Sequence, residues 1–301
     1  MSHSIVSSLI EGVVSSSDAP EEMLIANGAE GVPYVLKLKF TQLTPGLRGA
    51  LESLHGDGRP LSTLTGSVLG SDGFAGLAKL RFFIKSLGEK GFLRHALLLG
   101  DTVFMRIRPV AAQFRFDEQQ IAADKRYIGS RFACLRRGDA GQMIVESPTS
   151  HGVATLHHPA ALAAFHHLTR PCTAADLAEA SAELDEGAAR AFMACLASVG
   201  AIEEADDSGE TRTESDPALG QWSFHDLAFH TRSRMGRHDN PYGATYRNAK
   251  RFGSLPITKP AMSDERISLY KPDLDQLMRE DAPFSAVQDR RQSVREYGES
   301  P

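Results

Sequence analysis

The sequence predicts an α+β protein in which two winged helix-turn-helix-like domains lie in tandem and an extended arm follows them. Three features of the 301 residues indicate this organisation. A short turn motif occurs twice, and each copy is surrounded by the same order of strand-like and helix-like segments. The C-terminal part of the chain has several prolines and little periodicity.

The turn motif reads R-P-L-S at residues 59–62 and R-P-C-T at residues 170–173. Proline followed by a residue that can cap a helix is typical of a tight turn that leads into a helix. Each copy has a short apolar, helix-like segment before it and another after it. The repeat therefore predicts two similar domains.

A longer helix comes next in each copy, because apolar residues recur there at intervals of three and four. Both helices close at a glycine, in Leu87-Gly88 and in Val199-Gly200, as suits a left-handed C-terminal cap. The residues expected to be buried are Phe74, Leu77, Leu80, Ile84 and Leu87 in the first copy, and Leu184, Ala188, Phe192, Leu196 and Val199 in the second.

Strand-like segments flank these helices. Residues 92–99 and 102–110 are rich in β-forming residues and meet at Gly100-Asp101, which predicts a hairpin. A strand, three helices and a β wing describe a winged helix-turn-helix. The second wing is short, since only residues 202–204 have β character. Extended segments are also expected before each set of helices, at residues 34–40, 131–137, 142–146 and 153–157.

These elements predict four regions. A first winged-helix domain spans residues 1–125 and a second spans residues 126–205. Residues 206–220 are acidic and contain Gly, Ser and Thr, which favours a flexible linker. Residues 221–301 begin with one helix at 221–235 and continue as an extended arm. We expect the arm to lie along a neighbouring surface, because it lacks the periodicity to fold alone.

Composition excludes several classes of protein. A net charge of −5 gives no general reason to expect nucleic-acid binding. The three cysteines contain no C-x-x-C pair, which indicates reduced thiols and neither disulfides nor a zinc site. The N-terminus lacks the basic stretch of a signal peptide, and no apolar run approaches the ~20 residues of a membrane helix. We therefore expect a cytoplasmic protein.

Histidines cluster at positions 151, 157, 158, 166 and 167. Adjacent histidines point to different faces of a helix, and no acidic residue or cysteine supplies an obvious third ligand. We expect no metal site. The chain also lacks a nucleophile dyad, a Walker loop and a G-x-G-x-x-G motif, so no residue is assigned a catalytic role.

Winged helices bind either DNA or peptides, and the charge of the two copies favours peptides. Residues 59–110 carry eight Lys or Arg against three acidic residues, a net charge of +5. That charge alone would suit DNA. The helices of the second copy are acidic, which would repel phosphates, so a paired DNA footprint is not expected. The acidic residues are Asp176, Glu179, Glu183, Asp185 and Glu186, against Arg190.

A peptide can add to an exposed strand edge through main-chain hydrogen bonds, while a neighbouring helix holds its side chains. The extended segment at residues 34–40 and the long helix of the first copy are the candidates for this role. For each lysine involved, the alternative is solvated surface; for Phe74 it is the core. The expected contacts are Val35, Lys37, Lys39, Phe74, Lys79, Arg81 and Lys85.

Residues 222–247 read W-S-F-H-D-L-A-F-H-T-R-S-R-M-G-R-H-D-N-P-Y-G-A-T-Y-R, and I-S-L and K-P-D-L follow at 267–269 and 271–274. These segments resemble the entry into the flavin domain of SagB/ThcOx-type azoline dehydrogenases. The resemblance implies a nitroreductase-like, FMN-dependent enzyme that oxidises thiazolines and oxazolines to thiazoles and oxazoles in ribosomally made peptides. It also implies N-terminal peptide-clamp domains that bind a leader or precursor peptide, and a homodimeric full enzyme.

The last part of the chain contains R-R-Q-S-V-R at residues 290–295. Two arginines that bracket a serine at the start of a helix can hold a phosphate. The family pattern is nearer R-R-S-x-R, and its residues hold the phosphate of FMN. Arg291, Ser293 and Arg295 match it, whereas Gln292 departs from it and can still donate an amide N–H. In the family the isoalloxazine contacts come from later sequence and from a partner subunit, so we expect that this chain alone does not retain FMN.

The sequence leaves two functions open. In one, the chain is the peptide-binding, N-terminal portion of the dehydrogenase. It is then either truncated before the nitroreductase-like domain or one half of a split enzyme, with a separate catalytic half or cyclodehydratase subunits as partners. In the other, it is a non-enzymatic winged-helix regulator or adaptor. The sequence does not decide whether the chain is itself an enzyme, or which copy binds the peptide.

Overall fold

The structure is a computed structural model that describes residues 2–27, 36–234, 236–238, 249–253 and 256–293. The chain divides into two compact units, residues 1–245 and 246–301. Helices and strands are mixed in the first unit, so the predicted α+β class is confirmed.

The first repeat has strands, three helical stretches and a hairpin. Gly73, at a φ of 65°, divides the long helix α2 into two parts, which gives the third helical stretch. In chain order the elements are β1 (His3–Leu9), β2 (Val13–Ser16), β3 (Met23–Asn27), β4 (Lys37–Phe40), α1 (Pro45–Glu52), β5 (Arg59–Pro60), α2 (Leu61–Glu89), β6 (Leu93–Leu99) and β7 (Thr102–Pro109).

The second repeat has the same order of elements. Just as β1 pairs with β5 and β6, β8 pairs with β12 and meets the second turn motif through a bridge between Tyr127 and Cys172. The structure therefore contains the predicted repeat. The elements are β8 (Tyr127–Gly129), β9 (Cys134–Arg137), β10 (Met143–Glu146), β11 (Gly152–Leu156), α3 (Pro159–His167), α4 (Ala174–Glu179), α5 (Glu186–Ser198) and β12 (Ile202–Glu204).

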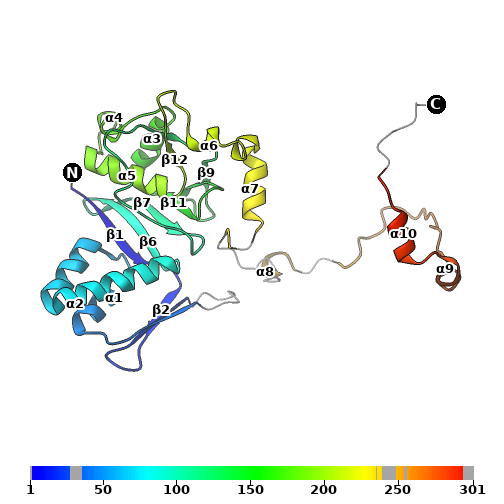
Figure 1. Ribbon diagram of the computed structural model, residues 1–301, viewed down its shortest axis with the longest axis horizontal. Helices are drawn as coiled ribbons and strands as arrows, with labels where there is room; N and C mark the ends of the chain where they lie inside the picture. Colours follow the sequence, from blue (N-terminus) through cyan, green and yellow to red (C-terminus); the bar gives the residue numbers. More distant parts are fainter. Residues whose placement is uncertain (1, 28–35, 235, 239–248, 254–255, 294–301) are drawn as a thin grey trace. The chain divides into compact units, whose positions relative to one another are not determined.

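A seven-stranded sheet joins the two repeats (Figure 1). Its order is β5-β1-β6-β7-β11-β10-β9, and the antiparallel pair of β7 with β11 connects the halves. Strands β2, β3 and β4 form a separate sheet in the first repeat. Strand β1, to which we assigned no structure, lies between β5 and the hairpin. The winged-helix description of the two domains therefore stays a prediction.

Two hydrophobic cores stabilise the first unit. One surrounds α5, and all five residues predicted to be buried in the second repeat are at most 4% exposed. The other lies between α1, α2 and the three-stranded sheet. There Leu80 and Leu87 are buried as predicted, but the burial of Phe74 was wrong, because its side chain is 82% exposed. Since Gly73 interrupts the helix, Phe74 begins a new helical part with its side chain outside the core.

The acidic stretch at residues 206–220 is folded, so the prediction of a flexible linker was wrong. Helix α6 (Arg212–Ser215) begins with a capping box made by Thr211 and Glu214, and the 3-10 helix η1 (Leu219–Gln221) follows. The carboxylate of Glu203 accepts a hydrogen bond from the amide of Thr213 at 3.1 Å. These bonds lead the chain into α7 (Phe224–Arg232), within the predicted helix at 221–235.

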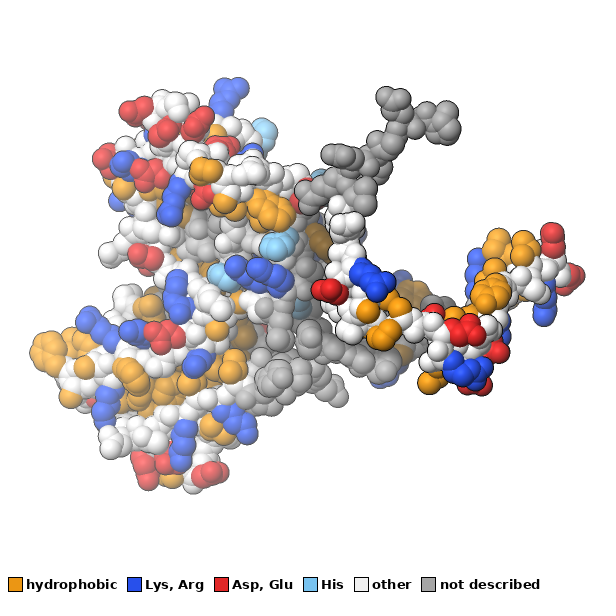
Figure 2. All heavy atoms as spheres, turned by 45° about the vertical axis from the view of Figure 1, so that its right-hand side comes forward, with side chains coloured by type: hydrophobic (Ala, Val, Ile, Leu, Met, Phe, Trp, Pro, Cys, Tyr) orange, Lys and Arg blue, Asp and Glu red, His pale blue; other side chains and the backbone are white. Residues whose placement is uncertain are grey.

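The second unit contains α8 (Ala249–Phe252), α9 (Leu274–Glu280) and α10 (Phe284–Arg290). None of its described residues is buried, and apolar side chains of α9 and α10 reach the surface (Figure 2). Among the described residues of the whole chain, no helix is both long and apolar enough to cross a bilayer.

Candidate functional site

Strand β4 forms an edge of the three-stranded sheet. The amide of Asn27 donates a hydrogen bond to the carbonyl of Leu36 at 3.1 Å, at the start of the β3–β4 ladder. Bonded pairs alternate along an antiparallel ladder, so the backbone groups of Lys37 and Lys39 point away from β3. Within the part of the chain that the structure describes, no strand pairs with this outer side of β4.

The two faces of β4 differ in character. Phe40 packs towards α2, where its ring lies 4.7 Å from that of Phe83 between centroids. Because side chains alternate along a strand, Lys37 and Lys39 project from the opposite face. Both are exposed, and Lys39 Nζ lies 2.8 Å from a carboxylate oxygen of Glu22.

The second part of α2 presents an exposed apolar and basic surface near β4. Phe74 is 82% exposed and Phe82 is 65% exposed. Lys79 Nζ donates to Gln42 Oε1 at 3.3 Å, which ties this surface to the loop that follows β4. Arg81 is also exposed. We call Phe74, Lys79, Arg81 and Phe82 the α2 surface.

The structure brings the predicted contacts together only in part. The helical residues share the α2 surface or its next turn, where Lys85 pairs with Glu89 at 3.8 Å. Lys37 and Lys39 lie on the face of the sheet that points away from the helix, so their side chains do not join the α2 surface and only their backbone groups lie along the strand edge. Val35 lies outside the described residues.

In the second repeat, the corresponding strand edge is occupied. β11 follows β9 and β10 as β4 follows β2 and β3, and its outer side pairs with β7 of the first repeat. Phe104 of β7 packs edge to face against Phe192 of α5, with ring centroids 5.5 Å apart and both rings fully buried. Strand β7 therefore lies against both β11 and α5 of the second repeat.

Helix α2 continues through Gly88 to Glu89, so the prediction that it closes at Gly88 was wrong. The glycine that follows α2 in the left-handed region is Gly91, at a φ of 70°, and its counterpart after α5 is Gly200, at a φ of 64°.

Aligning α2 and α5 on these two glycines relates part of the α2 surface to buried positions. Two exposed residues of α2 correspond to alanines of α5 that are at most 4% exposed, and the third corresponds to a half-buried arginine. The pairs are Lys79 with Ala188, Phe82 with Ala191, and Arg81 with Arg190.

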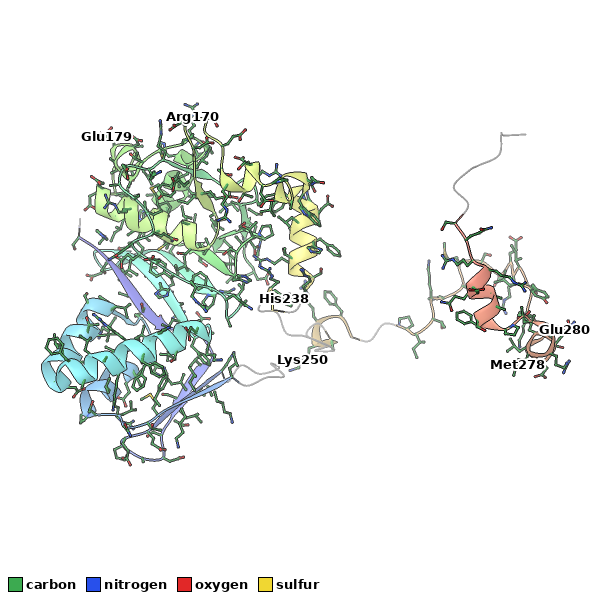
Figure 3. The ribbon with its side chains drawn as sticks, in the orientation of Figure 1. Arg170, Glu179, His238, Lys250, Met278 and Glu280 are labelled. Carbon is green, nitrogen blue, oxygen red and sulfur yellow. The ribbon has the colours of Figure 1, made fainter. Side chains whose placement is uncertain are left out.

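The segment with the family-like pattern is fixed to the second repeat by two arginines. Arg131 Nη2 donates to the carbonyl of Trp222 at 2.7 Å. Arg232 Nη2 donates to the carbonyl of Ser147 at 2.9 Å, in the turn between β10 and β11. The rings of Trp222 and His230 lie 5.1 Å apart. His238, labelled in Figure 3, lies beyond the C-terminal end of α7.

The clustered histidines serve separate local purposes. His158 Nδ1 accepts a hydrogen bond from the amide of Ala160 and caps α3. Burial lowers the pKa of His151 and of His157, and the neighbouring positive charges of Arg237 and Arg106 lower them further. Within the described residues, no group of three His, Cys, Asp or Glu side chains is placed to hold a metal ion.

His95 of β6 is a buried histidine to which we assigned no role from the sequence. Its Nδ1 lies 2.9 Å from Ser7 Oγ on β1, and its ring lies 4.5 Å from that of Phe116 between centroids. Burial lowers the pKa of His95 to about 4, so the imidazole is neutral near pH 7. Because Ser7 is 1% exposed and His95 is 9% exposed, this pair contributes to the fold.

Sequence reasoning also missed Phe82 and the grouping of three arginines. Arg94, Arg106 and Arg108 entered only the count of charge, yet they line one cleft of about 630 Å³. The alternation R-I-R at residues 106–108 was the available signal, because it places two arginines on one face of a strand. The lining residues are Ile10, Glu11, Asn27, Arg94, Arg106, Arg108, Pro109, Ala140, Gln142, Thr155 and His157.

The phosphate-type motif lies in the second unit and was expected to begin a helix. Instead α10 ends at Arg290, and Arg291 is its C-terminal capping residue. Residues 291–293 are exposed, and Arg295 lies outside the described residues. Guanidinium, amide and hydroxyl groups suit a phosphate chemically. Arg291 lines a cleft of about 490 Å³ together with Phe284, Val287, Gln288 and Arg290. The assignment of FMN to this motif stays a prediction.

Comparison with known proteins finds a family model that matches part of the chain. The model of the family described as "Cyanobactin oxidase ThcOx" matches residues 127–239, which run from the start of β8 to just beyond the described end of the α7 segment. This match supports a relation to the azoline oxidases and covers the second repeat rather than the first. No curated protein matches the chain.

Proposed function

We propose that residues 1–239 bind the precursor peptide of an FMN-dependent azoline dehydrogenase of the SagB/ThcOx type. In this proposal both repeats are winged-helix-related peptide-clamp domains, and the first one takes the peptide. The observation that carries the proposal is the open edge of β4 beside the α2 surface. The second repeat holds β7 at the equivalent place.

Strand β7 serves as an internal example of a bound chain. It adds to β11 by main-chain pairing and buries Phe104 against α5. Main-chain hydrogen bonds give affinity in this mode of recognition, while side-chain contacts give specificity. A peptide that added to β4 in the same way would place alternate side chains against the α2 surface.

The β4 edge and the α2 surface then have different roles. The backbone of Lys37 and Lys39 would pair with the peptide, as would that of Val35. Phe74 and Phe82 would contact its apolar side chains, because large aromatic groups exposed to water gain from being covered. Lys79, Arg81 and Lys85 would attract acidic side chains. Their contribution is to steer the peptide more than to hold it tightly.

The cofactor belongs to the same proposal. Arg291, Gln292, Ser293 and Arg295 would contact the phosphate of FMN in the full enzyme, and no residue described here is assigned to its ring. When bound, FMN would supply the oxidising chemistry, while protein groups supply binding and position. The proposed partners are a catalytic half or cyclodehydratase subunits, a homodimeric arrangement of the full enzyme, and a cytoplasmic setting.

A proline substitution tests the strand edge. We would select ligands from a library of random displayed peptides, label an enriched peptide with a fluorophore, and measure its affinity by anisotropy. Proline at position 39 removes the outward N–H while leaving the bonds to β3 in place. We expect Lys39→Pro to weaken binding by about ten-fold, since a hydrogen bond contributes ~0.5–1.5 kcal/mol and the ring blocks its neighbours.

The matched control is Lys39→Ala, which removes the same side chain and its ion pair with Glu22 but keeps the N–H. It should bind nearly as well as the unchanged chain. Circular dichroism would verify that both variants fold. Equal affinities of the proline and alanine variants, or failure to enrich any peptide, would contradict binding at the β4 edge.

A further inference from the structure

One face of the seven-stranded sheet carries a row of arginines. Arg106 and Arg108 stand two residues apart on β7, and side chains two apart on a strand share a face. The opposite face of β7 carries Met105 and Ile107, which are fully buried in the core around α5. Arg94 of β6 lines the same cleft as these two arginines.

The cleft is positively charged. Among the described residues that line it, three carry guanidinium groups and one, Glu11, carries a carboxylate. Thr155 of β11 lies directly opposite Arg106 in the ladder, and His157 lies two residues further along. The pKa of His157 is lowered by burial and then by the charge of Arg106, which agrees with a positive potential at this place.

The arginines are held by the fold more firmly than their carboxylate partners are. Arg94 Nε donates to Ser8 Oγ at 2.9 Å, and Nη2 donates to the carbonyl of Gly56 at 3.2 Å. Its side chain is only 16% exposed, whereas that of its partner Glu11 is 91% exposed. An ion pair with such an exposed carboxylate contributes little free energy, so the carboxylate of an incoming ligand can replace that of Glu11.

Arg106 has the same arrangement. It lies 3.6 Å from Asp57, and its side chain is 32% exposed while that of Asp57 is 98% exposed. Two positioned guanidinium groups thus face partners that lie almost wholly in water. Arginine is the cation best suited to a carboxylate, because its planar fork can donate two parallel hydrogen bonds.

The spacing of the arginines favours an extended peptide over a single phosphate. Residues two apart on a strand are about 6.8 Å apart, and alternate side chains of an extended peptide have the same repeat. Asn27, which bonds to Leu36 at the start of β4, also lines the cleft. The cleft therefore adjoins one end of the open strand edge.

We propose that this arginine cleft binds the alternating carboxylates of an extended acidic peptide segment. The proposal rests on the proposed function, because the segment would belong to the same peptide whose neighbouring residues add to β4. It assigns the recognition of acidic residues to Arg94, Arg106 and Arg108, in addition to the cations of α2.

Two labelled probe peptides test the cleft. One alternates Glu with Thr, and the other alternates Gln with Thr, so the probes differ in charge and hardly in shape. We expect the Glu peptide to bind the unchanged chain at least about ten-fold more tightly at low salt, because hydrogen bonds between charged groups are stronger than those between neutral ones. The double variant Arg106→Gln with Arg108→Gln should lose that preference.

The matched control is the double variant Arg170→Gln with Arg212→Gln, which removes the same charge from exposed positions. Arg170, labelled in Figure 3, lies at the opposite end of the first unit from the three-stranded sheet. The control should keep the preference for the Glu peptide. The proposal for the cleft would be contradicted if both double variants lost the preference for the Glu peptide equally. It would also be contradicted if the unchanged chain bound the two probes with equal affinity.

These outcomes are separable from the test of the strand edge. If library-selected peptides bind and respond to Lys39→Pro while the cleft variant has no effect, the cleft proposal fails and the proposed function stands. If no selected peptide binds, or Lys39→Pro has no effect, the proposed function fails whatever the Glu peptide does.

Discussion

In the second repeat, the outer side of β11 pairs with β7, and α5 is buried around most of its circumference. In the first repeat, the outer side of β4 pairs with no described strand, and α2 exposes Phe74 and Phe82. The two repeats thus use the same strand edge differently. The second repeat uses the edge of β11 to join the two halves of the sheet, and the first repeat leaves the edge of β4 available among the described strands. Under the proposed function, the first repeat is therefore the copy whose strand edge is available to a peptide, a choice that the sequence left undecided.

The largest expected effect comes from truncating one aromatic ring in each copy. Phe104→Ala removes a fully buried ring from the contact between β7 and α5. It should lower the free energy of unfolding by ~3–5 kcal/mol, as buried Phe→Ala changes do. Phe82→Ala changes an exposed ring and should alter stability by less than about 0.5 kcal/mol. Urea unfolding of both variants measures the difference.

The order of the two variants should be reversed when peptide affinity is measured. Phe82→Ala should lower the affinity for the library-selected peptide more than Phe104→Ala does, because the ring of Phe82 belongs to the α2 surface. A loss of stability in Phe82→Ala comparable to that of Phe104→Ala would mean that both surfaces are structural, and the comparison would fail.

A smaller effect is expected from acid at the junction between the repeats. His95 of β6 touches Phe116, which lies in the segment that leads to the second repeat. Its pKa is about 4 in the folded chain against 6.5 for an exposed histidine. The unfolded chain therefore binds a proton first as the pH falls. Stability is full above about pH 6.5 and falls towards pH 4, by about 3 kcal/mol at most.

Urea unfolding of the unchanged chain and of His95→Gln, at about pH 7 and about pH 4.5, measures this contribution. Glutamine can still bond to Ser7 but does not titrate in this range. The variant should lose less stability than the unchanged chain between the two values. An identical loss in both proteins would show that other groups dominate the acid response.

Replacing the cations of α2 should have a weaker effect, and that effect should be on peptide affinity and not on stability. The triple change of Lys79, Arg81 and Lys85 to Glu should weaken an acidic peptide by roughly ten-fold at low salt, because each exposed pair contributes ~0.2–1 kcal/mol. The matched control changes three exposed arginines elsewhere, Arg137, Arg170 and Arg212, to Glu. Affinities would be measured by fluorescence anisotropy. Equal affinities of the two triple variants would contradict a role of the α2 cations in binding.

The smallest effect is expected for binding to duplex DNA. Its measurement distinguishes a peptide-binding protein from a winged-helix regulator. Because the second repeat is acidic, only the first repeat could contact phosphates. We expect generic duplex to bind with a dissociation constant of ~10⁻⁴ to 10⁻⁶ M at physiological salt, or not at all. Selection from random duplex DNA followed by titration at two salt concentrations checks this. A nanomolar palindromic or direct-repeat site would favour the regulator.

The elements that the sequence predicted well have a strong local pattern. The stripe on α5 is regular and apolar, so its burial could be predicted from spacing alone. Strand β1 was missed because two of its buried residues, Ser7 and Ser8, are polar, and one of them bonds to His95 on a neighbouring strand. A buried serine whose partner lies 88 residues away leaves no local signal.

The candidate site was predicted less completely, for a related reason. Lys79 and Arg81 could be chosen from charge, but Phe82 stands beside the buried Phe83 and looked like part of the same apolar run. The open side of β4 depends on where β7 pairs, and that pairing is long-range. Charge counting found the arginines of β6 and β7 without their grouping, because the cleft exists only when the strands lie side by side.

The orientation of β7 has one more consequence, which concerns chain polarity. Strand β7 runs antiparallel to β11. A peptide that copied this polarity on β4 would point its C-terminal end towards Leu36 and Asn27, where the cleft begins. Residues that follow the strand-forming segment would then enter the cleft, and those that precede it would leave at the other end. If a peptide is fused to this chain through a short linker, the linker can reach only one end of the β4 edge. The shortest linker that still allows binding would therefore show in which direction the peptide runs along β4.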